Sequence, residues 1–296
     1  MAALLTAVCW AFNSVVFTMV GKRIGASSVN HLRLWSAFIV LCGLHLVMFR
    51  SVFPFEIGSQ HLKNFLFLSV SGVIGLAAGD LFFYESLLRV GPRLATLVML
   101  LAPVLGAFLA WILLGEFLVP AKIIGMIITM AGILWVVLER VEGKEPAGQS
   151  PHYVSGILLS VGGAIGQALG LLLSRMGMEG GISVISANHI RITSAAAVMA
   201  AAALFRGEVG SHVAKLKNKK IFLALMAGVI SGPVIGIILS LIAITHTQIG
   251  TASTLMSISP VLLIPVSYFL FGEKVSFRAI LGTMIALAGI ILLFLN

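Results

Sequence analysis

Asp80 is the only aspartate in the 296-residue sequence, and it follows three glycines in the last third of a long apolar run. A carboxylate near the centre of a lipid bilayer costs about 2.5–3.5 kcal/mol to insert, so we expect Asp80 to face a cavity or a partner. Two roles stay open: a carboxylate that exchanges protons or binds an amine, and one half of a structural ion pair with Arg33 or Arg89. Glu85 is a second candidate for proton coupling.

The other candidates for contact with a small molecule are neutral. Trp10 and Asn13 lie halfway along the first apolar run, and Gln167 lies in the corresponding stretch of the sixth. An amide in hydrocarbon needs a partner, which a substrate-lined cavity supplies, and an indole ring offers a face to a cation or an apolar group. For the Ser and Thr candidates, the alternative role is packing of their hydroxyl groups between helices. These further candidates for substrate binding are Tyr84, Thr96, Met99, Ser253, Thr254 and Ser257.

Hydrolytic chemistry finds no support. An intramembrane aspartyl protease needs two aspartates, and the HExxH motif of zinc proteases does not occur in the sequence. Cys9 and Cys42 both lie inside apolar runs, which is typical of small buried side chains rather than of a disulfide or a metal site. We therefore expect a protein that is not an enzyme and that has no metal site.

Composition identifies the elements that must position these side chains. Hydrophobic residues make up 59% of the chain and charged residues only 10%, whereas an ordinary globular domain has about 25% charged residues. Nineteen basic and ten acidic side chains cannot cover a soluble protein of this length. A soluble enzyme, a secreted disulfide scaffold and a disordered chain are excluded, which leaves an integral membrane protein. The net charge of +9 is then typical of cytoplasmic loops rather than of nucleic-acid binding.

A membrane-spanning helix needs roughly 20 apolar residues, and the sequence contains ten such runs. The runs are continuous rather than alternating, so we expect an all-α membrane protein and not a transmembrane barrel. They cover residues 2–20, 28–49, 63–87, 93–114, 118–138, 153–174, 182–205, 220–244, 251–271 and 275–295.

The chain also repeats itself. The motif NHLR at 30–33 recurs as NHIR at 188–191, and Glu116 and Glu273 end the fourth run of each half, where we expect interface or capping roles. Glycine and proline pairs share the 157-residue offset of Glu116 and Glu273 and extend the match over three helices. We expect a tandem duplication with a first five-helix unit at 1–140, a polar linker at 141–152 and a second unit at 153–296.

An odd number of spans per unit forces the second unit to enter the membrane from the opposite side. The two units are then inverted repeats, an architecture in which transporters place substrate near the midplane. Arg33 and Arg191 occupy matching positions and could each hold a substrate carboxylate by a bidentate fork. Their duplication favours a structural role instead, because we expect an inverted pair to lie near opposite membrane faces. His31 and His189 are interpreted in the same way, with pH sensing as the alternative.

These residues resemble the drug/metabolite transporter superfamily in its ten-helix EamA-type branch. The resemblance rests on an Arg early in the second helix of each half and on a Gly-Glu that ends the fourth. It also rests on GDLFFYESL at 79–87 and on the fifth helices IIGMIITMAGILWVV and ILGTMIALAGIILLF. It covers nearly the whole chain and implies a carrier of amino acids, other small metabolites or drugs that has no cofactor and both termini in the cytoplasm.

We therefore expect a multi-pass secondary transporter of the cell (inner or plasma) membrane that exports a small organic metabolite by alternating access, with or without proton exchange. The middle third of every run except 182–205, which contains Arg191, lacks Lys and Arg, and this favours a zwitterionic or amphipathic solute over a phosphorylated one. A membrane-embedded enzyme acting on a lipid-linked substrate and a channel are the alternatives. Fourteen of the 19 Lys and Arg lie on the side reached after odd-numbered runs, which places the termini outside the cytoplasm, against the resemblance. The sequence leaves the oligomeric state open.

Overall fold

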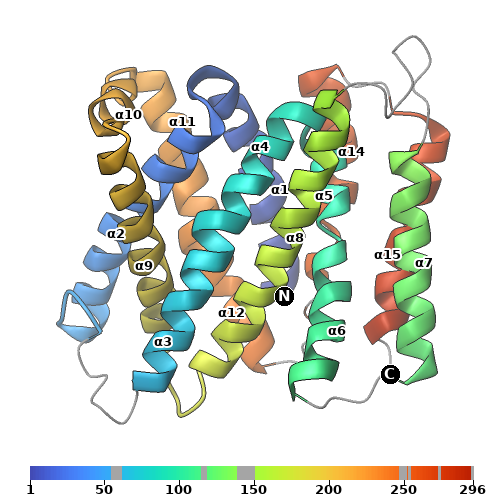
Figure 1. Ribbon diagram of the computed structural model, residues 1–296, viewed down its shortest axis with the longest axis horizontal. Helices are drawn as coiled ribbons and strands as arrows, with labels where there is room; N and C mark the ends of the chain where they lie inside the picture. Colours follow the sequence, from blue (N-terminus) through green and yellow to red (C-terminus); the bar gives the residue numbers. More distant parts are fainter. Residues whose placement is uncertain are drawn as a thin grey trace.

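The computed structural model describes residues 1–54, 62–114, 119–138, 151–246, 252, 255–272 and 275–294, and these form a bundle of helices without a strand (Figure 1). The first half contains α1 (Ala2–Ile24), α2 (Ala26–Phe49), α3 (Leu62–Ser71), η2 (Gly72–Gly79), α4 (Asp80–Val90), α5 (Pro92–Val98), α6 (Leu101–Leu114) and α7 (Pro120–Val137). The second half contains α8 (Pro151–Gly177), α9 (Val184–Phe205), α10 (Val209–Lys215), α11 (Lys219–Val229), η3 (Ile230–Gly236), α12 (Ile237–His246), α14 (Ser259–Phe271) and α15 (Phe277–Phe294).

Several predicted spans consist of consecutive elements. Continuous helical stretches run over Leu62–Val90, Pro92–Leu113 and Lys219–His246, and within the described residues eight stretches are long and apolar enough to cross a membrane. Helices Ser259–Phe271 and Phe277–Leu293 are apolar but shorter. An integral membrane protein built from helices is therefore confirmed, while the total of ten spans stays a prediction.

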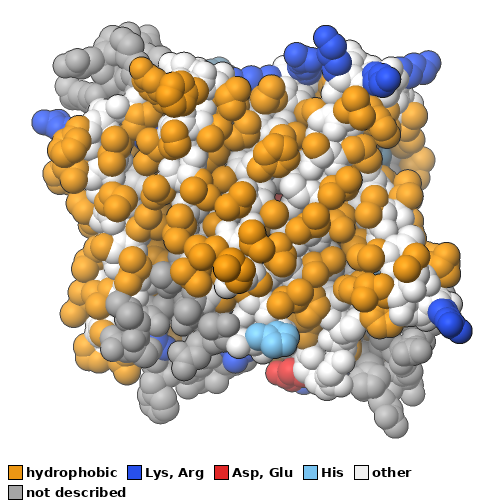
Figure 2. Space-filling view, turned by 180° about the vertical axis from the view of Figure 1, so that it is seen from behind, with side chains coloured by type: hydrophobic (Ala, Val, Ile, Leu, Met, Phe, Trp, Pro, Cys, Tyr) orange, Lys and Arg blue, Asp and Glu red, His pale blue; other side chains and the backbone are white. Residues whose placement is uncertain are grey.

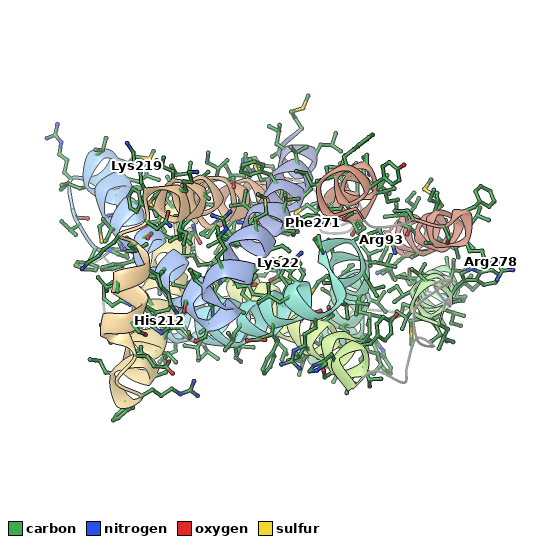
Figure 3. All side chains as sticks on the ribbon, turned by 90° about the horizontal axis from the view of Figure 1, so that it is seen from above. Lys22, Arg93, His212, Lys219, Phe271 and Arg278 are labelled. Atoms are coloured by element: carbon green, nitrogen blue, oxygen red, sulfur yellow. The ribbon has the colours of Figure 1, made fainter. Side chains whose placement is uncertain are left out.

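A broad apolar belt covers the face of the bundle that Figure 2 shows. Large side chains such as Ile39, Phe205 and Phe269 are exposed on its surface, as lipid contact requires. Basic residues gather at the rims of the belt, and Lys22, Lys219 and Arg278 lie at the end seen from above in Figure 3. The belt and its charged rims match a protein whose solvent is the bilayer.

Both long central helices contain a π-helical segment at the same place in each half. The segments are η2 and η3, and the second contains Pro233, which has no backbone N–H to donate. Wider turns leave carbonyl groups without helical partners, and a repeated asparagine binds one in each segment. Asn30 Nδ2 donates to the Ala77 carbonyl at 2.8 Å, and Asn188 Nδ2 donates to the Pro233 carbonyl at 3.0 Å. The repeated NH[L/I]R motif thus holds the repeated π-helical segment.

Glycines allow the closest helix contacts. A Cβ at Gly132 of α7 would lie 2.7 Å from the Gly282 carbonyl of α15, and one at Gly125 would lie 2.7 Å from the Gly289 carbonyl. The glycines of η2 lie similarly close to α8, where a Cβ at Gly79 would lie 3.2 Å from the Gly166 Cα. At Gly125 and Gly132 only hydrogen fits without a shift of the facing backbone, so these glycines let α7 and α15 pack closely.

Candidate functional site

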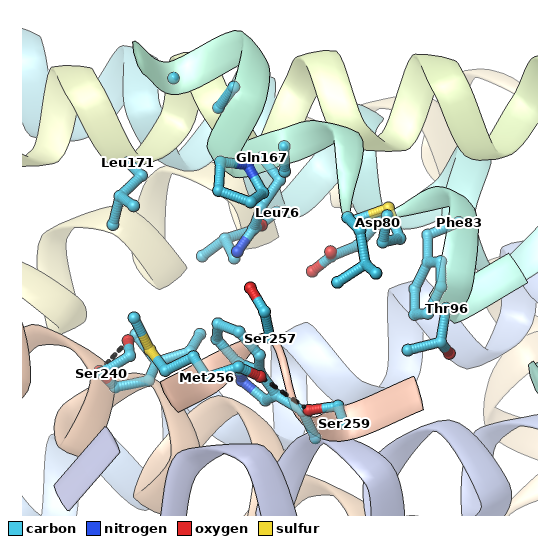
Figure 4. Close-up of a pocket in the computed structure, with 18 of the residues that line it drawn as sticks. Leu76, Asp80, Phe83, Thr96, Gln167, Leu171, Ser240, Met256, Ser257 and Ser259 are labelled. Atoms are coloured by element: carbon cyan, nitrogen blue, oxygen red, sulfur yellow. Dashed lines mark hydrogen bonds between the residues drawn. The ribbon is translucent and has the colours of Figure 1, made fainter. Parts of the chain in front are cut away.

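A cavity of about 480 Å³ lies inside the bundle between helices of both halves (Figure 4). This volume falls within the usual range for small-molecule sites, about 300–1,000 Å³. In Figure 4 Gln167 and Asp80 lie on one side of the cavity, opposite Met256 and Ser257. Eight residues that the sequence singled out for substrate binding line it: Trp10, Asn13, Asp80, Tyr84, Thr96, Met99, Gln167 and Ser257. The candidates Ser253 and Thr254 and the repeat pair Glu116 and Glu273 lie outside the described residues.

Asp80 is bound to Arg33, one of the two arginines expected as its partner. Arg33 Nη2 lies 2.5 Å from Asp80 Oδ2, and the side chains are 2% and 17% exposed. The same nitrogen donates to the Leu76 carbonyl at 2.8 Å, and Arg33 Nε donates to Asn30 Oδ1 at 2.9 Å. The guanidinium also lies 4.9 Å from the centroid of the Tyr84 ring. Arg33 therefore connects α2 to η2 and α4 while its ion pair faces the cavity.

Arg191 reaches the same cavity from the other half of the chain. It is 5% exposed, and its Nε donates to Ser71 Oγ at 3.0 Å. Gly72 allows this approach, because a Cβ there would clash with the backbone carbonyl of Arg191. Arg33 and Arg191 both line one cavity, so the expectation that they cannot meet at one site is wrong, while their position near opposite membrane faces stays a prediction.

The expectation of an interior without Lys or Arg is also wrong. Arg33 and Arg191 begin near the ends of their helices, but long side chains carry the guanidinium groups toward the cavity. Lys122 and Arg175, which were not singled out from the sequence, line it as well. Their position at the ends of apolar runs did not predict this, because a long side chain there can extend either to the membrane surface or into a cavity. The argument against an anionic substrate therefore loses its premise.

Several neutral groups leave hydrogen-bonding capacity facing the cavity. Thr96 Oγ1 is buried without a partner among the described residues, and the Gln167 amide makes no hydrogen bond to any of them. Asn13 Nδ2 donates to the Gly228 carbonyl at 2.9 Å, so this amide partly serves the packing of α1 on α11. Ser259 Oγ donates to the Ala7 carbonyl at 3.0 Å. The cavity thus offers both free polar atoms and apolar surface.

Glu85 is not brought to the cavity. Its carboxylate lies 3.6 Å from Arg89 one helical turn away, and both side chains are about one-third exposed. Arg89 Nη1 also donates to Ser155 Oγ at 2.9 Å. Asp80 is therefore the only coupling candidate from the sequence that lines the cavity.

The lining residues show which way the cavity extends. They follow α6 from Ala102 to Ala110 and α8 from Gln167 to Arg175, toward the ends of these helices at the bottom of Figure 1. At the other end, Lys22 Nζ lies 4.8 Å from the centroid of the Phe271 ring, so α1 contacts α14 there (Figure 3). The cavity thus runs from the level of Asp80 toward the end opposite this contact.

Histidines of the repeated motif contact a second histidine in each half. The His31 ring lies 4.8 Å from His212 of α10, and the His189 ring lies 5.4 Å from His45. His212 Nδ1 lies 2.9 Å from Ser28 Oγ. Burial and the nearby Lys215 lower the pKa of His212, against the opposing effect of Glu208. α10 is thereby docked on the α1–α2 turn through a neutral imidazole.

These features define an integral membrane protein whose helices enclose a polar, charged cavity. The model of the EamA-like transporter family matches residues 1–138 and again residues 154–295, so the chain belongs to this family, which is part of the drug/metabolite transporter superfamily. A protein of known crystal structure shares the fold with a TM-score of 0.67 at 20% sequence identity, over 99% of this chain and 95% of its own. None of the curated proteins matches the sequence. Membership of a transporter family points to a protein that is not an enzyme.

Proposed function

We propose that this protein is a secondary transporter of the cell membrane that exports a small organic metabolite, such as an amino acid or a related amphipathic solute, by alternating access. The observation that carries the proposal is the cavity of about 480 Å³, which combines the Asp80–Arg33 ion pair with unpartnered polar atoms inside an apolar bundle. Charged side chains inside an apolar bundle are costly to insert into a membrane, and a purely structural protein gains nothing from them. A binding site for a polar solute explains why this protein contains them.

Two five-helix repeats at 1–140 and 153–296, joined by a linker at 141–152, support the alternating-access part of the proposal. The family match falls in two segments, and the π-helical segments η2 and η3 recur at equivalent places with an asparagine on each. In transporters built from inverted repeats, one repeat rocks against the other around a fixed site. We propose that η2 and η3 supply the flexibility for this motion, since π-helical turns often occur at functional sites.

The proposed direction of transport follows from the orientation that we propose for the protein in the membrane. Basic residues of the described chain are concentrated at the end that carries Lys22 and Lys219, which the positive-inside rule assigns to the cytoplasm. The termini then face outward, and a reporter fused to Asn296 tests this directly. The cavity in its present form extends away from the cytoplasm, as it would after releasing an exported solute.

The coupling mechanism has two versions, which differ in the part that Asp80 takes. In the first, Asp80 leaves Arg33 and exchanges a proton during the cycle. In the second, the ion pair is permanent and movement is uncoupled. Asp80→Asn separates them, because it abolishes the response to a proton gradient only in the first version.

Counterflow in proteoliposomes tests the proposed function. A solute panel is first ranked by the thermal stabilisation of purified protein, since a ligand that binds the folded state raises its melting temperature. Liposomes preloaded with a stabilising solute should then show saturable, transient accumulation of the labelled solute. Flux that is linear in concentration would indicate a channel, and turnover without translocation would indicate an enzyme.

A further inference from the structure

The two repeat-related arginines have unequal partners. Arg33 is paired with Asp80, but the position 157 residues further on, which is equivalent to Asp80 in the second half, is Ile237. Ile237 also lines the cavity and offers no charge. No carboxylate among the described residues lies within ion-pair distance of Arg191. Arg191 therefore has no ion-pair partner of its own among the described residues, and the Asp80 carboxylate that also attracts it is already paired with Arg33.

The geometry of Arg191 leaves its fork available. Its only hydrogen bond within the described chain is from Nε to Ser71 Oγ, which fixes the guanidinium by its inner nitrogen. The two outer nitrogens have no described partner, and the residue lines the cavity while it is 5% exposed. Outer guanidinium nitrogens that are unpartnered and held in place match the two oxygens of a carboxylate. A buried cation without a partner is expensive, so its retention points to a ligand.

We propose that Arg191 binds the carboxylate of the transported solute and so makes this carrier selective for monoanionic or zwitterionic organic acids. This inference deepens the proposed function. Transport of the carboxylate rests on that function, whereas binding of the carboxylate to Arg191 does not. Arg33, Asp80 and Arg191 together leave one positive charge beside the ion pair, which calls for a negative group on the ligand, and Lys122 and Arg175 add further positive charge to the lining. The remaining lining, including Trp10, Phe83 and Met99, suits an apolar or aromatic body.

The test uses two probes of the same shape that differ in charge, 3-phenylpropanoate and 3-phenylpropanamide. Dissociation constants are measured by titration calorimetry on the purified full chain at millimolar ligand. Wild-type protein should bind the carboxylate about 10- to 100-fold more tightly than the amide, the range expected for charge-assisted hydrogen bonds in a desolvated site. Arg191→Gln should abolish this preference and leave the affinity for the amide unchanged. Arg191→Lys should retain part of the preference, since it keeps the charge without the fork.

Two control variants separate binding from folding. Ser71→Ala removes the hydrogen bond to Arg191 Nε and should leave most of the preference for the carboxylate, which a purely structural Arg191 would not predict. Ile237→Asp keeps Arg191 and adds a negative charge to the cavity wall, so it should reduce the preference even if Arg191→Gln does not fold. Ile237 lines the cavity, and Ser71 contacts Arg191 without lining the cavity itself.

The outcomes are distinct from those of the proposed function. Equal binding of the two probes, no carboxylate binding, tighter binding of phenyl phosphate than of the carboxylate, or an unchanged preference in both Arg191→Gln and Ile237→Asp would overturn the assignment. Carboxylate binding that depends on Arg191, without counterflow in proteoliposomes, would support the anion site and contradict the transporter.

Discussion

Replacing Asp80 by Asn breaks the buried ion pair with the smallest possible change in shape. Removal of one partner from a buried pair costs about 3–5 kcal/mol, because the other charge stays buried without compensation. Arg33 is 2% exposed and would keep its bonds to the Leu76 carbonyl and Asn30 Oδ1. The new amide oxygen can still accept from Arg33, which returns about 1 kcal/mol, and the 17% exposure of Asp80 gives further relief. We expect a net loss of about 2–3 kcal/mol.

Thermal unfolding in detergent measures this loss. At about 2–4 °C per kcal/mol for a chain of this size class, the melting temperature should fall by about 5–10 °C. The double variant with Arg33→Gln should be less destabilised than the sum of the single variants, because both members of the pair are then neutral. The neutral residue at 80 should also tighten binding of 3-phenylpropanoate, since it exposes a second positive charge. A melting temperature within about 1 °C of wild type, or additive single variants, would refute the interpretation of Arg33–Asp80 as a buried coupled pair.

Three further predictions concern packing, pH and motion. Gly132→Ala should destabilise the protein by about 1–3 kcal/mol, because the new Cβ would press against the Gly282 carbonyl. The control Gly43→Ala should not destabilise it, since a Cβ at Gly43 meets no atom within 4 Å. Equal melting temperatures of the two variants would contradict the close α7–α15 contact. Because the pKa of His212 is lowered by burial and Lys215, its contribution to stability is complete above about pH 6.5 and declines as the pH falls, by at most about 1.4 kcal/mol per unit of pKa difference. Between pH 7.5 and 5.5 the stability of the His212→Gln variant should therefore fall less than that of the wild type. Stability curves that run parallel over this pH range would contradict the prediction. Pro233→Ala restores a backbone donor in η3 and should slow transport without weakening solute binding; normal transport and normal conformational exchange would count against flexibility at this segment.

The sequence predicted the helices and much of the cavity wall because both follow from local rules. Apolar runs of spanning length predicted the bundle. Polar groups in the middle of these runs, such as Trp10, Asn13 and Gln167, needed a polar neighbour, which the cavity supplies. The repeat predicted equivalent positions in the two halves, and the π-helical segments with Asn30 and Asn188 agree with it.

The charge of the cavity was not predictable in the same way. Spacing from the helix end placed Arg33 and Arg191 near the membrane surface, but a guanidinium extends well beyond its Cα, and Gly72 of η2 lets Arg191 approach from the side. Glu85 failed as a cavity residue because the Arg89 partner one turn away holds it on the helix surface. The contact of His31 with His212 joins distant parts of the chain and has no local signal. Side-chain direction, rather than helix position, is what the sequence lacks.

Alternating access to one cavity is the central claim, and thiol labelling of a single cysteine tests it most directly. The native Cys9 and Cys42 are replaced by Ala, and Gln167→Cys, which faces the cavity in Figure 4, supplies the only thiol. Oriented proteoliposomes are treated with a membrane-impermeant maleimide from one side or the other, with and without 3-phenylpropanoate. The account predicts that position 167 reacts from both sides of the membrane and that the carboxylate protects it. Labelling from one side only, whatever the ligand or gradient, would contradict alternating access.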